Sequence, residues 1–153
     1  MIDAGQKLPS FSLANQDGAT RTNASYAGKW LVLYVYPKDD TPGCTIQGKS
    51  FTATKGDFDK RHAVVVGLSA DDTSSHKAFC NKFNFTIELL ADPQARLLEA
   101  LGAGQKEWQG TMYWNRTTFL VDPQGVVRKV YTGVKPEGHE QAVLKDLDAM
   151  AKS

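Results

Sequence analysis

Cys44 is the residue of this 153-residue chain whose surroundings best suit nucleophilic chemistry. It follows Thr41, Pro42 and Gly43 in a polar loop, and a helix is predicted to begin at about this point. The start of a helix presents unsatisfied N–H groups and a partial positive charge, and both favour a thiolate over a thiol. The alternative is an inert cysteine that packs as a small hydrophobe, which a loop containing Pro and Gly disfavours. The spacing therefore predicts a reactive cysteine at a helix start.

Three further residues could complete a site around Cys44. The Thr41 hydroxyl could lie beside the sulfur and donate a hydrogen bond to a substrate oxygen. Arg116 opens a later strand and could bring its guanidinium to the same edge of the sheet, and Pro37 follows a predicted strand. Each of them also has an ordinary structural explanation: a capping threonine, a solvated arginine and a proline that ends a strand.

Apolar runs and turn residues predict strands that alternate with helices. Two uninterrupted apolar runs, 30–36 and 63–69, have the pattern of strands covered on both faces. Shorter strands are expected within 9–21 and around the turn 122–125, and helices at about 45–61, 71–83, 97–101 and 137–151. Residues 104–115 are expected to form a loop rich in aromatic side chains. This order predicts an α/β fold: a central mixed sheet with helices on both faces and an N-terminal hairpin. On such sheets chemistry lies where a strand's carboxyl end meets a helix, here the loop 37–44.

The composition excludes several classes of protein. A length of 153 residues suits one domain, 1–153, and two cysteines cannot form the disulfide framework of a small secreted scaffold. Lysine and arginine total 18 against 17 acidic residues, so neither nucleic acid nor a membrane is expected as a partner. No secretory signal or membrane-spanning helix is expected from the apolar runs. The expected location is therefore the cytoplasm, where thiols stay reduced.

The motif Pro37-x-x-x-Thr41-x-x-Cys44 resembles the active-site signature of the peroxiredoxins. The run 36–45 is similar to the Q-type branch of that family, the bacterioferritin comigratory proteins, and so are segments within 75–79, 89–92, 116–122 and 134–139. The resemblance implies a thioredoxin-like fold and a thiol peroxidase that reduces hydrogen peroxide and organic hydroperoxides to water and alcohols. It also implies a monomer that needs no cofactor or metal and is recycled by thioredoxin or a glutaredoxin-type reductant.

The same resemblance implies a role for each residue of the site. Cys44 would attack the peroxide and become a sulfenic acid. Arg116 and the backbone N–H groups at the helix start, those of Gly43 and Cys44, would hold the thiolate and the peroxide. Thr41 would orient the peroxide oxygens, and Pro37 would shield the sulfur from water.

Cys80 is the second cysteine, and the resemblance implies that it resolves the sulfenic acid. Many Q-type members have that cysteine five residues after the first, where this chain has Lys49. A subset has it on the following helix, where Cys80 stands 36 residues after Cys44, so an intramolecular disulfide is expected. Two alternatives stay open: a one-cysteine peroxidase resolved by an external thiol, and a redox-switched binding or holdase protein. A thioredoxin-type oxidoreductase is disfavoured because the chain has no Cys-x-x-Cys motif.

A disulfide between Cys44 and Cys80 requires Cα atoms about 4.4–6.8 Å apart. Cysteines on separate helices, one at a helix start and one in mid-helix, are not expected to meet that distance in the reduced protein. We therefore expect the first turn after Cys44 and the helix around Cys80 to unfold locally on oxidation, and Gly48, a weak helix former, to ease the first event. Cys80 lies about 100° around the helix from Phe79, so partial exposure of Cys80 is expected.

Other residues could serve a metal or a substrate. His76 and Cys80 stand at i, i+4 on one helix face, which is half of a zinc site, but two further ligands are not evident. His62 and His139 are predicted to lie on the surface, and neither has a neighbour that marks it as a general base. Three aromatic side chains of the loop 104–115 either wall the entrance of a peroxide site or bury that loop; they are Trp108, Tyr113 and Trp114.

Overall fold

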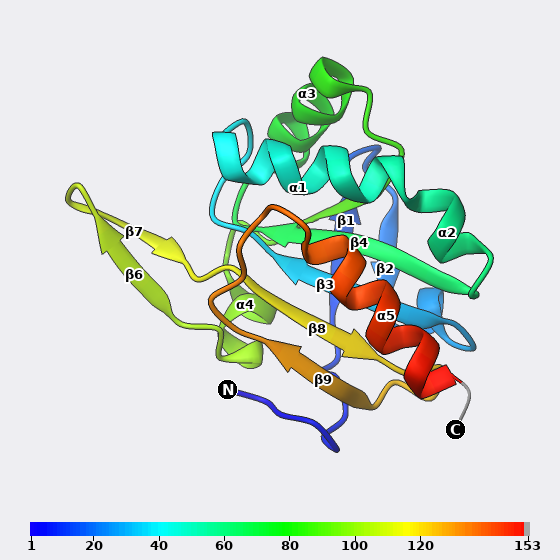
Figure 1. The fold of residues 1–153 in the computed structure, drawn as a ribbon. Coiled ribbons are helices and arrows are strands. Elements are labelled where there is room, and N and C mark those ends of the chain that lie inside the picture. The colour runs from blue at the N-terminus through cyan, green and yellow to red at the C-terminus, as the bar shows by residue number, and fades with distance from the viewer. Residues whose placement is uncertain (152–153) are drawn as a thin grey trace.

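A central sheet organises the protein, whose computed structural model describes residues 1–151 (Figure 1). Its strands are β1 (Ser12–Asn15), β2 (Thr20–Thr22), β3 (Trp30–Val35), β4 (Ala63–Ser69), β5 (Glu88–Ala91), β8 (Thr117–Val121) and β9 (Val127–Tyr131). Within the described residues these seven strands lie in the order β2-β1-β5-β4-β3-β8-β9. Strands β3, β4 and β5 run parallel, and the other neighbouring pairs are antiparallel. The predicted mixed sheet with an N-terminal hairpin, β1–β2, is confirmed.

Helices cover both faces of this sheet. Helices α1 (Pro42–Ala53), α2 (Lys55–Asp59), α3 (Thr73–Phe83) and α5 (His139–Ala151) pack on one face. Helix α4 (Arg96–Leu101) and the 3-10 helix η1 (Asn23–Tyr26) pack on the other. Strand β3 contributes Val32 and Tyr34 to the first core and Leu31 and Leu33 to the second, which explains its continuous apolar run. No helix within residues 1–151 is long and apolar enough to cross a membrane.

The helix predicted at 45–61 is in fact two helices, so that prediction was wrong at its start and at its centre. Helix α1 begins already at Pro42, because a proline at the first helical position loses no hydrogen bond. The break falls at Thr54, where φ is −102° and ψ is 7°. The Thr54 hydroxyl donates to the Ser50 carbonyl at 2.8 Å and competes with the helical hydrogen-bond pattern.

Residues 104–115 contain a β-hairpin, so the prediction of a loop was wrong. Its strands are β6 (Gln105–Trp108) and β7 (Thr111–Trp114), and the hairpin extends away from the main sheet (Figure 1). Gln109 and Gly110 form its turn with φ values of 51° and 81°, the combination that a type I′ turn requires. Gln-Gly is not one of the familiar sequence signals for this turn, and the exposed strand β6 has no apolar alternation.

Gly48 allows the segment after α3 to approach α1 closely. A Cβ atom at Gly48 would lie 2.2 Å from Cζ of Phe85 and 2.4 Å from its Cε2. The Phe85 ring in turn meets Phe79 edge-on, with ring centroids 4.8 Å apart. A glycine that the sequence suggested only as a weak helix former is therefore required for α1 to pack against this aromatic pair.

We predict that Gly48→Ala lowers the free energy of unfolding by about 1–3 kcal/mol, because the added methyl group overpacks the Phe85 ring. Gly56 in α2 supplies the matched control, since a Cβ atom there meets nothing within 4 Å. Gly56→Ala should raise stability by about 0.5–1 kcal/mol through helix propensity. Urea unfolding followed by circular dichroism measures both changes, and a stabilised Gly48→Ala protein would contradict the packing described.

Candidate active site

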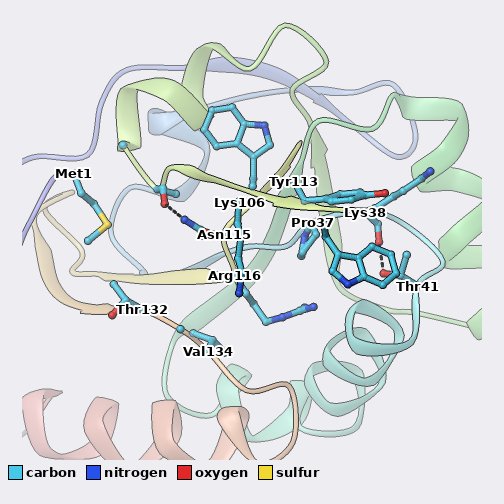
Figure 2. Close-up of a pocket in the computed structure, with 15 residues that line it drawn as sticks. Met1, Pro37, Lys38, Thr41, Lys106, Tyr113, Asn115, Arg116, Thr132 and Val134 are labelled. Carbon is cyan, nitrogen blue, oxygen red and sulfur yellow. Dashed lines mark hydrogen bonds between the residues drawn. The ribbon is translucent and has the colours of Figure 1, made fainter. Parts of the chain in front are cut away.

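The loop 36–41 joins the carboxyl end of β3 to the start of α1, where the sequence predicted chemistry. Thr41 is the N-cap of α1, but its hydroxyl donates to the Lys38 carbonyl at 2.8 Å and makes no hydrogen bond to the helix (Figure 2). The first-turn N–H groups of Gly43 and Cys44 therefore find no acceptor in the cap side chain. Because the Thr41 hydrogen is committed to Lys38, its oxygen is left as an acceptor and not as the donor that was expected.

Cys44 lies against the guanidinium of Arg116. Cys44 is 1% exposed, and Arg116 Nη1 donates to Cys44 Sγ at 3.5 Å and to Gln47 Oε1 at 2.5 Å. The burial that suits an inert cysteine is thus combined with a fixed positive charge beside the sulfur. A donor preorganised in this way can stabilise negative charge on an attacking sulfur and on a departing oxygen.

Two residues position Arg116, and reasoning from the sequence missed both of these roles. Gln47 stands three residues after Cys44, on the same side of α1, so its buried amide reaches the guanidinium. Gln47 Nε2 is buried and has no hydrogen-bond partner among the described residues. A Cβ atom on Gly43 would lie 2.8 Å from Arg116 Nη2, so a glycine is needed for this approach. The i, i+3 spacing of Cys44 and Gln47 was the available signal.

A cavity of about 810 Å³ opens at Arg116 (Figure 2). Pro37 and Thr41 of the loop 36–41 line it together with Arg116, which is distant in sequence. The three aromatic side chains of the hairpin line it as well, namely Trp108, Tyr113 and Trp114. This position supports the hypothesis that they wall an entrance. Cys44 is not in the lining, and Arg116 is the residue that links its sulfur to the cavity.

Cys80 is buried in the same apolar core as Cys44, and both thiols are free. Cys80 is 6% exposed, so the expectation of partial exposure was wrong. The reason is that the chain after α3 turns back over the helix, where the Phe85 N–H donates to the Cys80 carbonyl at 3.0 Å and the Phe85 ring covers Phe79. Burial raises the pKa of Cys80 to about 11, and the charge of nearby Asp39 adds to the effect. In this conformation Cys80 is a poor nucleophile.

A buried polar network connects the loop before α1 to α3. Asp39 Oδ2 lies 2.7 Å from His76 Nδ1, and Asp39 Oδ1 accepts the Tyr36 hydroxyl hydrogen at 2.6 Å. His76 Nε2 donates to the Leu90 carbonyl at 2.8 Å, since a carbonyl can only accept. Both ring nitrogens are therefore occupied, and a zinc site formed by His76 with Cys80 has no free imidazole nitrogen in this conformation.

Asp39, Asp71 and His76 are the described residues whose possible metal-ligand atoms lie within 4.8 Å of one another. Asp71 accepts hydrogen bonds from the Asp39 N–H at 2.9 Å and from the Ser69 hydroxyl at 2.7 Å. A metal ion would have to displace these bonds. The cluster therefore acts as a satisfied hydrogen-bond network that holds the loop 36–41 against α3.

His139 is buried, so the prediction of a surface position was wrong, whereas His62 is exposed as predicted. Helix α5 begins at His139, and its imidazole Nε2 lies 2.8 Å from Thr118 Oγ1. The ring also meets Tyr131 edge-on, with centroids 5.1 Å apart. Burial lowers the pKa of His139 to about 4, and the positive charge of Arg116 acts in the same direction.

The sequence resembles known proteins over its whole length. The AhpC/TSA family matches residues 4–130. A putative peroxiredoxin Bcp from Helicobacter pylori is 40% identical over 152 residues, which are 95% of this chain and 98% of that protein. The peroxiredoxin Bcp of Xanthomonas campestris is 40% identical over 159 residues, which cover 99% of each chain.

Solved structures agree with this relationship. A mutant of Xylella fastidiosa PrxQ superposes with a TM-score of 0.93 at 33% identity and covers 99% of this chain and 98% of its own. The bacterioferritin comigratory protein of X. campestris, solved in a study of its alkyl peroxide reduction activity, gives a TM-score of 0.90 at 38% identity and covers 97% of this chain and 99% of its own. Two mutants of that organism's peroxiredoxin Q replace single cysteines that stand 36 residues apart, the spacing of Cys44 and Cys80 here.

We predict that iodoacetamide modifies Cys80 about a hundredfold more slowly in the folded protein than in urea at about pH 7.5, because alkylation needs the thiolate that burial disfavours. Peptide mapping by mass spectrometry separates Cys80 from Cys44, and the unfolded chain serves as the internal control. Equal rates in the two states would show that α3 is open in the reduced protein.

Acid stability should depend on His139. In the folded protein this imidazole stays neutral down to a pH of about 4, whereas the unfolded chain takes up the proton near 6.5. Because the unfolded state binds more protons between these values, the free energy of unfolding should fall as the pH falls from about 6.5 to about 4. In His139→Gln, which cannot titrate, urea midpoints should fall less steeply over this range. Parallel curves for the two proteins would contradict a buried, neutral imidazole.

Proposed function

This chain belongs to the AhpC/TSA family and is a peroxiredoxin, and from that premise we propose that its Cys44 thiolate reduces peroxides and that Cys80 resolves the product as an intramolecular disulfide. The observation that carries the proposal is the hydrogen bond from Arg116 to Cys44 Sγ, 3.5 Å long, at the start of a helix. The proposed substrates are hydrogen peroxide and organic hydroperoxides. The alkyl peroxide reduction described for the X. campestris relative supports the second class.

In the first step Cys44 Sγ attacks the terminal oxygen of the peroxide. The S–O bond forms as the O–O bond breaks, which leaves a sulfenic acid on Cys44 and an alkoxide or hydroxide that takes up a proton to give an alcohol or water. Arg116 and the first-turn N–H groups of Gly43 and Cys44 stabilise the charge on the departing oxygen. The Thr41 oxygen accepts the peroxide O–H, since its own hydrogen is already donated to a carbonyl. Pro37, half-buried in the cavity wall, shields the sulfur from water.

In the second step the Cys80 thiolate attacks the sulfenic sulfur; the S–S bond forms as the S–O bond breaks, and the departing hydroxide takes up a proton to give water. The cysteine spacing shared with the X. campestris mutants supports this role. Cys80 must first leave the core and lose its proton, so the first turn of α1 and helix α3 open locally. Opening breaks the exposed ion pair between Lys82 and Asp40, 2.8 Å long, and the contact of Lys49 with the Phe83 ring. These exposed contacts contribute little stability, so the cost of local opening comes from the buried packing of Phe79 with Phe85 and from the hydrogen bond between His76 and Asp39.

The burial of Cys80 also favours the second candidate, a one-cysteine peroxidase whose sulfenic acid is resolved by an external thiol. In the two-cysteine mechanism a dithiol protein of the thioredoxin or glutaredoxin type supplies two electrons to the disulfide and regenerates both thiols. We place the enzyme in the cytoplasm as a monomer of one domain. Two free cysteines fit a reducing compartment.

Replacing each cysteine separately assigns the two roles. Cys44→Ser should abolish peroxide turnover with a dithiol reductant, because it removes the thiol that takes the oxygen atom and that the reductant regenerates. Cys80→Ser should still gain one oxygen atom from one equivalent of hydrogen peroxide, whereas the wild type should lose two hydrogen atoms as the disulfide forms. Intact-mass spectrometry distinguishes these products.

Cys80→Ala is the control for the hydroxyl that serine brings into the core, and both Cys80 variants should behave alike. If wild type and Cys80→Ser both stop at the sulfenic acid, Cys80 is not the resolving residue and an external thiol completes the cycle. If Cys80→Ser forms any internal cross-link, the pairing proposed here is wrong.

A further inference from the structure

Among the described residues, the cavity at Arg116 is lined by basic side chains and by no acidic side chain. Its described lining includes Lys38, Lys106 and Arg116 and contains no aspartate or glutamate, although the whole chain has 18 basic and 17 acidic residues. Neither Lys38 nor Lys106 forms an ion pair with a residue of the described range 1–151. The side chains that line the cavity therefore carry an excess of positive charge.

The same cavity is mostly apolar and much larger than hydrogen peroxide requires. Trp108 and Tyr113 meet edge-to-face on its wall with ring centroids 6.4 Å apart, and Trp114, Ala103 and Val134 add further apolar surface. Its volume of about 810 Å³ far exceeds the space for hydrogen peroxide, which is on the order of twice the 30 Å³ of a water molecule. The cavity therefore suits a ligand with an apolar body.

The chemistry of the proposed reaction directs the organic part of a hydroperoxide into this cavity. Cys44 takes the terminal oxygen, so the carbon stays on the departing oxygen, whose charge Arg116 stabilises. Arg116 both contacts Cys44 Sγ and lines the cavity, so the organic group extends from the guanidinium between the aromatic walls. Lys38 lines the same cavity as Tyr113 (Figure 2), and Lys106 is the direct partner of Tyr113 across the hairpin.

We propose that this cavity selects organic hydroperoxides that carry a carboxylate. The apolar body packs against the aromatic walls, the hydroperoxide reaches Arg116 and Cys44, and the carboxylate lies near Lys38 and Lys106. This inference rests on the proposed peroxidase function. The step is the one already described: Cys44 gains the terminal oxygen, the O–O bond breaks, and the departing alkoxide is protonated, while the carboxylate is unchanged.

Two hydroperoxides of nearly equal shape test the selectivity. They are cumene hydroperoxide and its para-carboxylate, and the readout is the ratio of their kcat/KM values, the carboxylate over the neutral compound. The ratio should exceed one at low ionic strength and fall as salt is added, because the lysines are exposed and their attraction is screened. Lys106→Gln and Lys38→Gln should each lower the ratio by about two- to fivefold, the range measured for exposed charge pairs.

Lys60→Gln is the matched control. It removes the same charge from an exposed lysine that follows α2, on the side of the molecule away from the hairpin (Figure 1). Its ratio should equal that of the wild type. A ratio of one in the wild type, or one that falls equally in Lys60→Gln and Lys106→Gln, would overturn the proposal and leave the peroxidase function intact.

A binding measurement separates this inference from the proposed function. The unreactive alcohol that corresponds to each hydroperoxide is titrated into the reduced protein while tryptophan fluorescence is followed, since Trp108 and Trp114 line the cavity. The carboxylated alcohol should bind more tightly than the neutral one, and Lys106→Gln should remove most of the difference. If this preference is found but no hydroperoxide oxidises Cys44, the peroxidase proposal fails and the selective cavity stands. Equal affinities for the two alcohols would overturn the inference.

Discussion

The contact between Arg116 and the buried sulfur of Cys44 is the interaction on which the rest of the site depends. The sheet register produces it: β8 pairs with β3 so that Thr117 lies opposite Val35, and the preceding residue, Arg116, therefore stands at the carboxyl end of β3, where α1 begins. Gly43 leaves room for the guanidinium and Gln47 holds one of its nitrogens. A charge fixed in this way needs little reorganisation during reaction.

The contact of Arg116 with Cys44 is fixed in place, whereas Cys80 is buried and would have to move in order to react. The reduced protein gains stability by packing Cys80 and Phe79 under Phe85, yet a resolving cysteine must become exposed and deprotonated. The network of Asp39 and His76 links the loop before α1 to α3, so the segments that carry the two cysteines are held together in the reduced state. In the two-cysteine mechanism proposed above, local opening sets the rate of resolution, and the intrinsic reactivity of a thiol does not.

The core of the site could be predicted because its residues lie next to clear local sequence signals. Cys44, Thr41 and Pro37 share one loop with a Pro and Gly signal, and the strand that follows Arg116 has a clear apolar pattern. Gln47 was missed because a glutamine in a helix is usually exposed. Gln47 becomes a hydrogen-bond partner of Arg116 only because the start of β8 lies next to α1. The burial of Cys80 depends on Phe85, which lies just beyond the end of α3, and the burial of His139 depends on Thr118 of β8. No periodicity within one helix reports either contact. The β6–β7 hairpin was missed for a local reason, since Gln-Gly is an uncommon turn pair.

The rate at which hydrogen peroxide oxidises the Cys44 thiol tests the central claim most directly. Stopped-flow fluorescence of reduced Cys80→Ser protein isolates this step, because no disulfide can follow it, and free cysteine at the same pH is the reference. The account predicts a second-order rate constant at least about a hundredfold above that of free cysteine, the scale on which one preorganised donor acts. A rate constant no greater than that of free cysteine would contradict the assignment of Cys44 as a peroxide-reducing residue activated by Arg116.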